Sequence, residues 1–308
     1  MAIKINDLVK RYGDRLVLDF FNMEVQEGEI FGLLGSDGAG KSTVIDCILD
    51  RLPYDRGEIT IFSEKLTKKN RALKRKIGVV PQQLVLLQEL TVYENIDYFC
   101  GLYILDKQQR YQLVQEAMSL CDLNAVADTY PQKLSTGMCR RLNLACSIAH
   151  KPQLLIVDEP FLGTDVLSRD IISEAIKRLH MTGVTVFYVS KDIEEMSHLC
   201  NRIAIMDKGR VVITATTDEL KAIISVGEKI TIEVFKMSAE AVEEISMMKG
   251  VVFANYVHHE LVVKSDKGKN NLANILHFLE DRKIPFGKVY SEVPMLKDVF
   301  WEITGREL

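Results

Sequence analysis

The sequence of 308 residues has no long apolar run, no strong excess of charge and no cysteine-pairing pattern. None of its apolar runs approaches the roughly 18–20 residues that cross a bilayer, and charged residues interrupt the N-terminal stretch where a signal peptide would have its apolar core. We therefore expect a soluble, intracellular chain. Lys and Arg number 39 against 43 Asp and Glu, and the net charge of −4 makes free nucleic acid a poor default partner.

The six cysteines form no CxxC pair and no Cys/His spacing typical of zinc. Cys47, Cys139 and Cys146 lie in apolar helical patterns, where a free thiol behaves as a small apolar side chain. In a cytosolic setting we expect reduced, structural thiols. The adjacent His258 and His259 suggest a zinc site, but neighbouring residues of a strand point to opposite faces, which favours exposed or half-buried strand histidines.

The length predicts two domains, because 308 residues exceed one ordinary small domain and 47% hydrophobic residues are enough for a buried core. The composition changes near residue 226, so we predict a first domain over 1–226 and a second over 227–308. No internal repeat or low-complexity segment is present in the sequence.

The first domain shows the alternation of an α/β fold. Short apolar runs at 30–34, 154–157 and 184–189 are typical of fully buried parallel strands, and a helical pattern follows the first of them at 42–52. Residues 83–151 instead carry one helical pattern after another, which predicts a helical insertion into this core. We predict a mostly parallel sheet covered by helices.

The second domain alternates differently. Strand patterns at 230–235, 251–256, 261–265 and 287–291 enclose helical patterns at 239–248 and 271–282, and a last helix is expected at 294–304. The order β-α-β-β-α-β predicts a small α+β domain of the ferredoxin-like kind.

A glycine-rich loop joins the first buried strand to the following helix. Its glycines would let successive backbone N–H groups turn inward as an anion nest, and the helix adds the positive end of its dipole. Lys41 supplies a charge for the β- and γ-phosphates, and the Ser42 hydroxyl suits Mg²⁺. The motif GxxxxGK[ST] is matched in full, with Thr43 next in the chain, by Gly35, Ser36, Asp37, Gly38, Ala39, Gly40, Lys41 and Ser42. The alternative is a chance match in a glycine turn, which the strand-helix context disfavours.

Two carboxylates follow the buried run at 154–157. Because the chain turns at the carboxyl end of a parallel strand, both side chains can reach the same cleft. We predict that Asp158 holds Mg²⁺ and that Glu159 polarises the attacking water. The alternative for these residues alone is a polar strand exit.

Residues 134–138, Leu-Ser-Thr-Gly-Met, resemble the LSGGQ signature of ABC transporter ATP-binding subunits, and Cys-Arg-Arg-Leu-Asn-Leu-Ala follows as its helix. The resemblance covers residues 3–225, and the ending at 294–304 resembles bacterial ABC-2-type exporter ATPases. It implies an ATPase that uses ATP and Mg²⁺, dimerises around two nucleotides and drives a separately encoded membrane permease. It also implies a peripheral location on the inner face of the cell membrane.

The resemblance assigns further roles residue by residue. Tyr12 matches the aromatic residue that stacks on adenine, and Gln82 matches the glutamine that contacts Mg²⁺ and moves with the permease. Ser135 and Gly137 match signature residues that meet the γ-phosphate bound to the opposite subunit, and Asp165 matches an aspartate that communicates across the dimer. Without the resemblance, Tyr12 would be interpreted as a surface tyrosine and Gln82 as a loop amide. Ser135 and Asp165 would be interpreted as helix caps.

Four departures from the family pattern concern catalysis. Ser36-Asp37 replaces Pro-Asn, Thr136 replaces a signature glycine, and Met138 replaces the signature glutamine. The largest departure is Lys191, which stands where the family has a switch histidine. Histidine donates and accepts hydrogen bonds whereas lysine only donates, so we predict tight ATP binding with slow hydrolysis.

Two alternatives remain at this point, and a third is disfavoured. In the first, Lys191 is an adequate catalytic replacement for the switch histidine. In the second, the chain is a weakly hydrolysing half of a heterodimer, and ATP serves mainly to hold the dimer together. A DNA-repair or chromosome ATPase of the same superfamily would need long coiled coils or zinc-binding cysteines, and the sequence has neither. The resemblance implies that the separate permease largely supplies the selectivity for the transported substrate.

Overall fold

The computed structural model describes residues 1–65, 67, 69–223, 226–266, 271–292 and 300, and it divides the chain into two compact units. The first unit is Met1–Thr217 and the second begins at Asp218. Helix α8 (Thr217–Ile223) therefore falls mostly in the second unit, ahead of the boundary predicted after residue 226. Residue 226 is the first residue of strand β10 (Val226–Val234).

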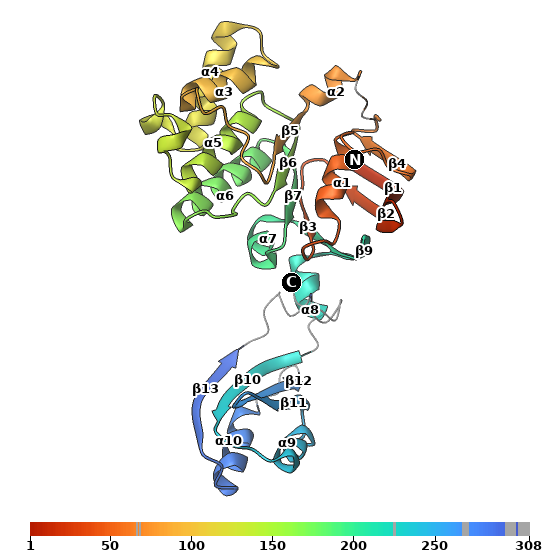
Figure 1. The fold of residues 1–308 in the computed structure, drawn as a ribbon, viewed down its shortest axis with the longest axis vertical. Helices are drawn as coiled ribbons and strands as arrows, with labels where there is room; N and C mark the ends of the chain where they lie inside the picture. Colours follow the sequence, from red (N-terminus) through yellow and green to blue (C-terminus); the bar gives the residue numbers. More distant parts are fainter. Residues whose placement is uncertain (66, 68, 224–225, 267–270, 293–299, 301–308) are drawn as a thin grey trace. The chain divides into compact units, whose positions relative to one another are not determined.

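The core of the first unit is a six-stranded sheet in the order β5-β6-β7-β3-β8-β9. Figure 1 labels β5, β6, β7, β3 and β9 of this sheet. Its strands β5, β6, β7, β3 and β8 pair in parallel, and β9 pairs antiparallel with β8. Strands β3 and β7 are buried along their whole length, which explains their continuous apolar sequence. The predicted α/β fold is confirmed. The strands are β3 (Ile30–Leu34), β5 (Ile77–Val80), β6 (Leu154–Asp158), β7 (Thr185–Ser190), β8 (Arg202–Asp207) and β9 (Arg210–Thr216).

A second, antiparallel sheet consists of β1 (Ile3–Tyr12), β2 (Arg15–Val25) and β4 (Arg56–Ile61) in the order β2-β1-β4. Helix α1 (Lys41–Ile48) shares one hydrophobic core with both sheets. Phe21 from β2, Val44 from α1 and Phe31 from β3 belong to that core. The common core fixes the β1–β2 hairpin relative to the loop that precedes α1.

The helical insertion contains α3 (Val92–Gly101), α4 (Lys107–Leu120) and α5 (Thr136–Ile148). A capping box between Thr91 and Glu94 begins α3, and the Ser135 side chain begins α5. Helix α5 is buried over most of its length and packs against α3, α4, β5 and α6 (Val166–Met181). The short elements of this unit are α2 (Arg71–Arg75), α7 (Ile193–Leu199) and the 3₁₀ turns Asn124–Val126 and Pro131–Lys133.

The second unit has the predicted β-α-β-β-α-β order. Its elements are β10, α9 (Ala239–Ser246), β11 (Val251–Val257), β12 (Glu260–Asp266), α10 (Leu272–Asp281) and β13 (Phe286–Glu292). The sheet runs β11-β12-β10-β13 with antiparallel neighbours, and side chains such as Ile232, Val263 and Ile275 form its core. This is the ferredoxin-like arrangement. The helix expected at 294–304 lies, apart from Phe300, outside the described residues.

All six cysteines are free and buried, as the sequence predicts. Burial raises the pKa of both Cys47 and Cys100 to about 11, which keeps these thiols protonated and inert near neutral pH. Within the described part of the chain, no group of His, Cys, Asp and Glu is arranged to hold a metal ion by itself. None of the helices among those residues has the length and apolar character needed to cross a membrane.

Candidate nucleotide-binding site

A cavity of about 350 Å³ opens where the β1–β2 hairpin, the glycine-rich loop and the carboxyl end of β6 meet. The residues that line it are Tyr12, Arg15, Val17, Asp37, Gly38, Gly40, Lys41, Ser42, Thr43, Gln82, Asp158 and Glu159. Arg15 and Val17 were not predicted from the sequence as residues of this site. Arg15 pairs with Tyr12 across the hairpin, so the tight turn at Gly13 was the available signal.

The glycine-rich loop has a backbone that only glycine adopts easily. Gly40 has a φ of 111° and directly precedes α1. A Cβ at this position would lie 2.9 Å from Met206 Cε and 3.2 Å from the Val17 carbonyl oxygen. The loop therefore needs glycine both for its conformation and for its close packing.

The Lys41 side chain folds back onto the glycine-rich loop that precedes it. Its ammonium group donates to the carbonyl oxygens of Gly35 at 2.6 Å and Ser36 at 3.1 Å. Burial lowers the pKa of Lys41, while the nearby carboxylates Glu159, Asp37 and Asp158 act in the opposite direction. Gly35, Ser36 and Ala39 are not among the residues that line the cavity, but the first two hold the lysine at its edge.

The two carboxylates at the end of β6 are costly to ionise without a cation. Burial, and next the neighbouring Glu159, raise the pKa of Asp158 to about 6. Burial also raises the pKa of Glu159, although Lys41 and Lys191 oppose that shift. Glu159 has a φ of 48°, and its backbone N–H donates to the Val189 carbonyl at 2.9 Å. This backbone turn lets both adjacent side chains reach the cavity.

Comparison with known proteins decides the family. A family model described as ABC transporter matches residues 18–162. Over 313 residues the chain is 32% identical to the linearmycin resistance ATP-binding protein LnrL of Bacillus subtilis (strain 168), covering 99% of each chain. The chain belongs to the ABC transporter family of ATP-binding proteins.

Two further proteins are similar to this ABC ATP-binding protein. The Nod factor export ATP-binding protein I of Sinorhizobium fredii (strain NBRC 101917 / NGR234) is 31% identical over 319 residues, which cover 100% of this chain and 87% of that one. A solved ATP-binding cassette, a dimer in a post-hydrolysis state bound to ADP and Pi, matches with a TM-score of 0.64 and 26% identity. That match covers 70% of this chain and 98% of the solved chain.

The signature residues of this ABC ATP-binding protein lie together, but none of them lines its own nucleotide cavity. The Ser135 hydroxyl accepts a hydrogen bond from the Met138 N–H at 3.2 Å, and Asp165 accepts from both the N–H and the hydroxyl of Ser168 at 2.9 Å. These hydrogen bonds lower the pKa of Asp165. A Cβ on Gly137 would lie 2.3 Å from both the Asp165 carboxylate and the Ser168 hydroxyl.

This close approach predicts that Gly137→Ala destabilises the nucleotide-free chain. The added methyl has to separate α5 from the start of α6, and overpacking of this kind costs about 1–3 kcal/mol in the free energy of unfolding. Thermal and urea unfolding without nucleotide would measure the loss. Thr136→Ala is the matched control, because Thr136 is exposed on the same turn of the helix and its substitution should change stability by less than about 0.5 kcal/mol. Equal stability of Gly137→Ala and the parent chain would contradict the packing argument.

Two of the four departures from the family pattern meet in space. The Lys191 ammonium donates to the Asp37 carboxylate at 3.1 Å, and this hydrogen bond raises the pKa of Lys191. The negative charge of Asp37 in the glycine-rich loop is therefore paired with Lys191, which stands where the family has a histidine. This contact was not predicted from the sequence, because a lysine and an aspartate 154 positions apart carry no local signal of pairing.

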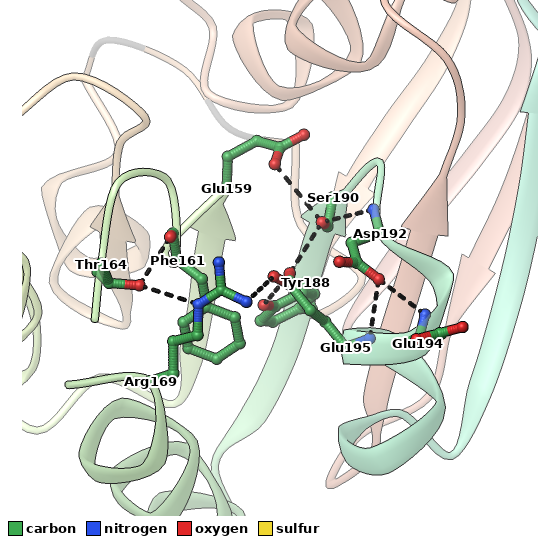
Figure 2. A network of polar contacts seen from close by, with 9 residues as sticks. All are labelled: Glu159, Phe161, Thr164, Arg169, Tyr188, Ser190, Asp192, Glu194 and Glu195. Atoms are coloured by element: carbon green, nitrogen blue, oxygen red, sulfur yellow. Dashed lines mark hydrogen bonds and ion pairs between the residues drawn. The ribbon is translucent and has the colours of Figure 1, made fainter. Parts of the chain in front are cut away.

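A network behind Glu159 was not predicted from the sequence (Figure 2). The Ser190 hydroxyl lies 3.5 Å from Glu159 Oε2 and 3.2 Å from Glu195 Oε2. Glu195 Oε1 lies 3.7 Å from the Arg169 guanidinium, whose Nε donates to the Thr164 hydroxyl at 3.3 Å. The network thus joins Glu159 to the segment that leads into Asp165.

Proposed function

We propose that this chain hydrolyses ATP as part of a dimer and drives a separate membrane-spanning permease, acting as an exporter. The observation that carries the proposal is one cavity holding Lys41, Asp158 and Glu159, while Ser135 and Gly137 lie outside it. A phosphate-binding lysine and a water-polarising carboxylate are the parts that ATP hydrolysis needs. The names of the relatives, in linearmycin resistance and Nod factor export, support export as the direction.

The residues of the cavity fit Mg²⁺ as well as ATP. Ser42, Gln82 and Asp158 offer a hydroxyl, an amide and a carboxylate oxygen to the same space, and such hard oxygen ligands suit Mg²⁺. When bound, the ion neutralises charge on the phosphate oxygens. The backbone of the glycine-rich loop and Lys41 would hold the phosphates, Tyr12 would stack on the adenine, and Glu159 would take a proton from the attacking water.

The signature residues support a dimer in which each nucleotide is closed by the other subunit. Ser135 caps α5, a 13-residue helix, so its free N–H groups offer an anion site at a place that the chain's own cavity does not reach. We expect Ser135 and Gly137 of one copy to meet the γ-phosphate held by the other. Asp165 follows the segment that the Glu159 network reaches, which supports its proposed role in communication between the two sites.

A groove between the helical insertion and the sheet is the proposed docking site for the permease. It has a volume of about 270 Å³, and Pro81, Val85, Phe99, Leu102 and Tyr103 contribute much of its lining. A permease segment bound here would place this chain on the cytoplasmic face of the membrane.

The loop that carries Gln82 joins this groove to the nucleotide cavity. The Arg140 guanidinium donates to the carbonyl oxygens of both Gln82 and Leu162, and Asn143 bonds Pro81 and Val85. Helix α5 therefore holds the Gln82 loop and the segment before Asp165 together. A displacement of the groove by a bound permease would be transmitted through Arg140 to the Gln82 loop and to the segment before Asp165.

The alternative is a weakly hydrolysing half of a heterodimer, and Lys191 is the observation that favours it. Lysine cannot accept a hydrogen bond, so it cannot order the attacking water as histidine does. Glu159 is nevertheless present and reaches the cavity, which supports a working although slow site.

ATP-dependent dimerisation tests the proposal. In light scattering after size exclusion, we expect Glu159→Gln to form dimers with Mg-ATP and to remain monomeric with Mg-ADP. Glu159→Gln/Lys41→Met should stay monomeric in both, because it lacks the phosphate-binding charge. A chain that binds ATP without self-association, but dimerises with a second ABC ATPase, would favour the heterodimer. Failure to bind ATP would contradict the proposed function.

A further inference from the structure

Glu195 is a partly buried carboxyl that is linked to Glu159 through one intervening residue, Ser190 (Figure 2). Its side chain, from α7, is 15% exposed and does not line the nucleotide cavity. Its Oε2 lies 3.2 Å from the Ser190 hydroxyl, which in turn lies 3.5 Å from Glu159 Oε2. The hydrogen-bond path from Glu195 to Glu159 therefore passes through Ser190.

Ser190 does not have enough hydrogens for both carboxylates. Its buried hydroxyl has one hydrogen and two lone pairs, and one lone pair already accepts the Asp192 N–H at 3.0 Å. If both carboxyls are ionised, only one of them can receive the single hydrogen, and Glu195 is the nearer. If Glu195 is protonated, its own O–H can donate to the remaining lone pair of Ser190. The Ser190 hydrogen is then available for Glu159.

The surroundings of Glu195 bring the loss of its carboxyl proton close to neutral pH. Burial and then the Asp192 carboxylate raise the pKa of Glu195 to about 7, against the opposing effects of Ser190 and Arg169. The groups that face it are Asp192 at the start of α7, Arg169 from α6, Glu159 from the end of β6 and Tyr188 from β7. The Tyr188 hydroxyl, 3.5 Å away, has a pKa well above its usual value and stays protonated.

We propose that Glu195 is a positioning residue for ATP hydrolysis, because its proton decides whether the Ser190 hydroxyl hydrogen is directed to the Glu159 carboxylate. This inference rests on the proposed function. With Glu195 protonated, Ser190 holds Glu159 in one orientation. With Glu195 ionised, Ser190 turns to Glu195, and Glu159 loses that donor and gains a second negative charge nearby. Hydrolysis should therefore decline as the pH rises through about 7.

The pH dependence of Mg-ATP hydrolysis by the full chain tests the role of Glu195. We expect the parent rate to fall about tenfold between roughly pH 6 and pH 8.5, as expected when a catalytic group loses its orientation. Glu195→Gln should lose this decline, because its amide N–H donates to Ser190 at every pH. Ser190→Ala should be slower than the parent and should also lose the decline.

Glu194→Gln is the matched control for the charge change. Glu194 is the preceding residue of the same helix and is exposed, and none of its side-chain atoms belongs to the network in Figure 2. Its substitution should leave both the rate and the pH profile of the parent unchanged. If Glu195→Gln is slower than the parent by the same factor at every pH, Glu195 serves only the ion pair with Arg169, and the inference is overturned.

A measurement without nucleotide separates this inference from the proposed function. In a ¹³C-glutamate-labelled chain, one carboxyl resonance should titrate near pH 7 and be missing from Glu195→Gln. If no such resonance exists, the role of Glu195 is overturned whatever the rates show. If it exists but the parent hydrolyses no ATP at any pH, the proposed function is the part that fails.

Discussion

Replacing Glu159 with glutamine should lower kcat for ATP hydrolysis by about 10²–10⁴-fold while leaving ATP binding nearly unchanged. Glutamine has the same shape as glutamate and can still accept a hydrogen bond from Ser190, but it cannot take a proton from water. The phosphate contacts that we propose for Lys41 and the glycine-rich loop would not be made by the Glu159 carboxylate. The loss should therefore appear in the chemical step and not in the dissociation constant.

Single-turnover hydrolysis and equilibrium ATP binding, measured on the same preparation, would show this separation. Glu174→Gln is a suitable control, because Glu174 is exposed on α6 and forms an ion pair with Arg178, one turn further along the same helix. Its rate should match that of the parent. If Glu159→Gln kept more than about a third of the parent kcat, another group would be the base, and our assignment of Glu159 would be wrong.

The parts of this protein that the sequence predicts are those that local patterns encode. Buried parallel strands such as β3 and β7 read as continuous apolar runs because both faces are covered. The glycine-rich loop is recognisable because its backbone conformation requires glycine at fixed positions, as at Gly40. In the second unit, every second residue of β12 and of the second half of β10 is buried. The matching alternation of apolar residues in the sequence allowed these strands to be predicted.

The features that the sequence did not predict depend on contacts between distant residues. The grouping of β1, β2 and β4 into a second sheet is decided by packing around α1, which no local pattern in the sequence encodes. Glu195 looks like an ordinary acidic residue in the first turn of a helix, where negative charge is favourable. Only the fold shows that it is partly buried and lies against Ser190 and Arg169.

The contact between Lys191 and Asp37 joins residues that are 154 positions apart, and it changes how the missing histidine is interpreted. Both side chains are largely exposed, at 48% for Lys191 and 81% for Asp37, so solvent screens their attraction. A bound γ-phosphate carries more charge than Asp37 and would draw the ammonium away from it. Lys191 is then able to strengthen ATP binding, although it cannot accept a hydrogen bond from the attacking water.

Lys191→His should therefore raise kcat by about one to two orders of magnitude, the size typical of a restored catalytic group. Lys191→Ala should weaken ATP binding without raising kcat, because it removes the charge and supplies no acceptor. The rates and ATP affinities of these variants and of the parent, measured at one pH and one salt concentration, would test both statements. A fast parent enzyme that gains nothing from Lys191→His would show that lysine is an adequate replacement.

Asp37→Asn supplies the matched comparison for this experiment. Removing the carboxylate takes a negative charge away from the phosphates and frees Lys191, so ATP affinity should increase. In the double variant with Lys191→Ala the gain should be smaller, because the two side chains touch and their effects do not add. If the gain is the same in both backgrounds, Asp37 acts on the phosphate alone. In that case the two departures from the family pattern are independent, and the ion pair has no part in ATP binding.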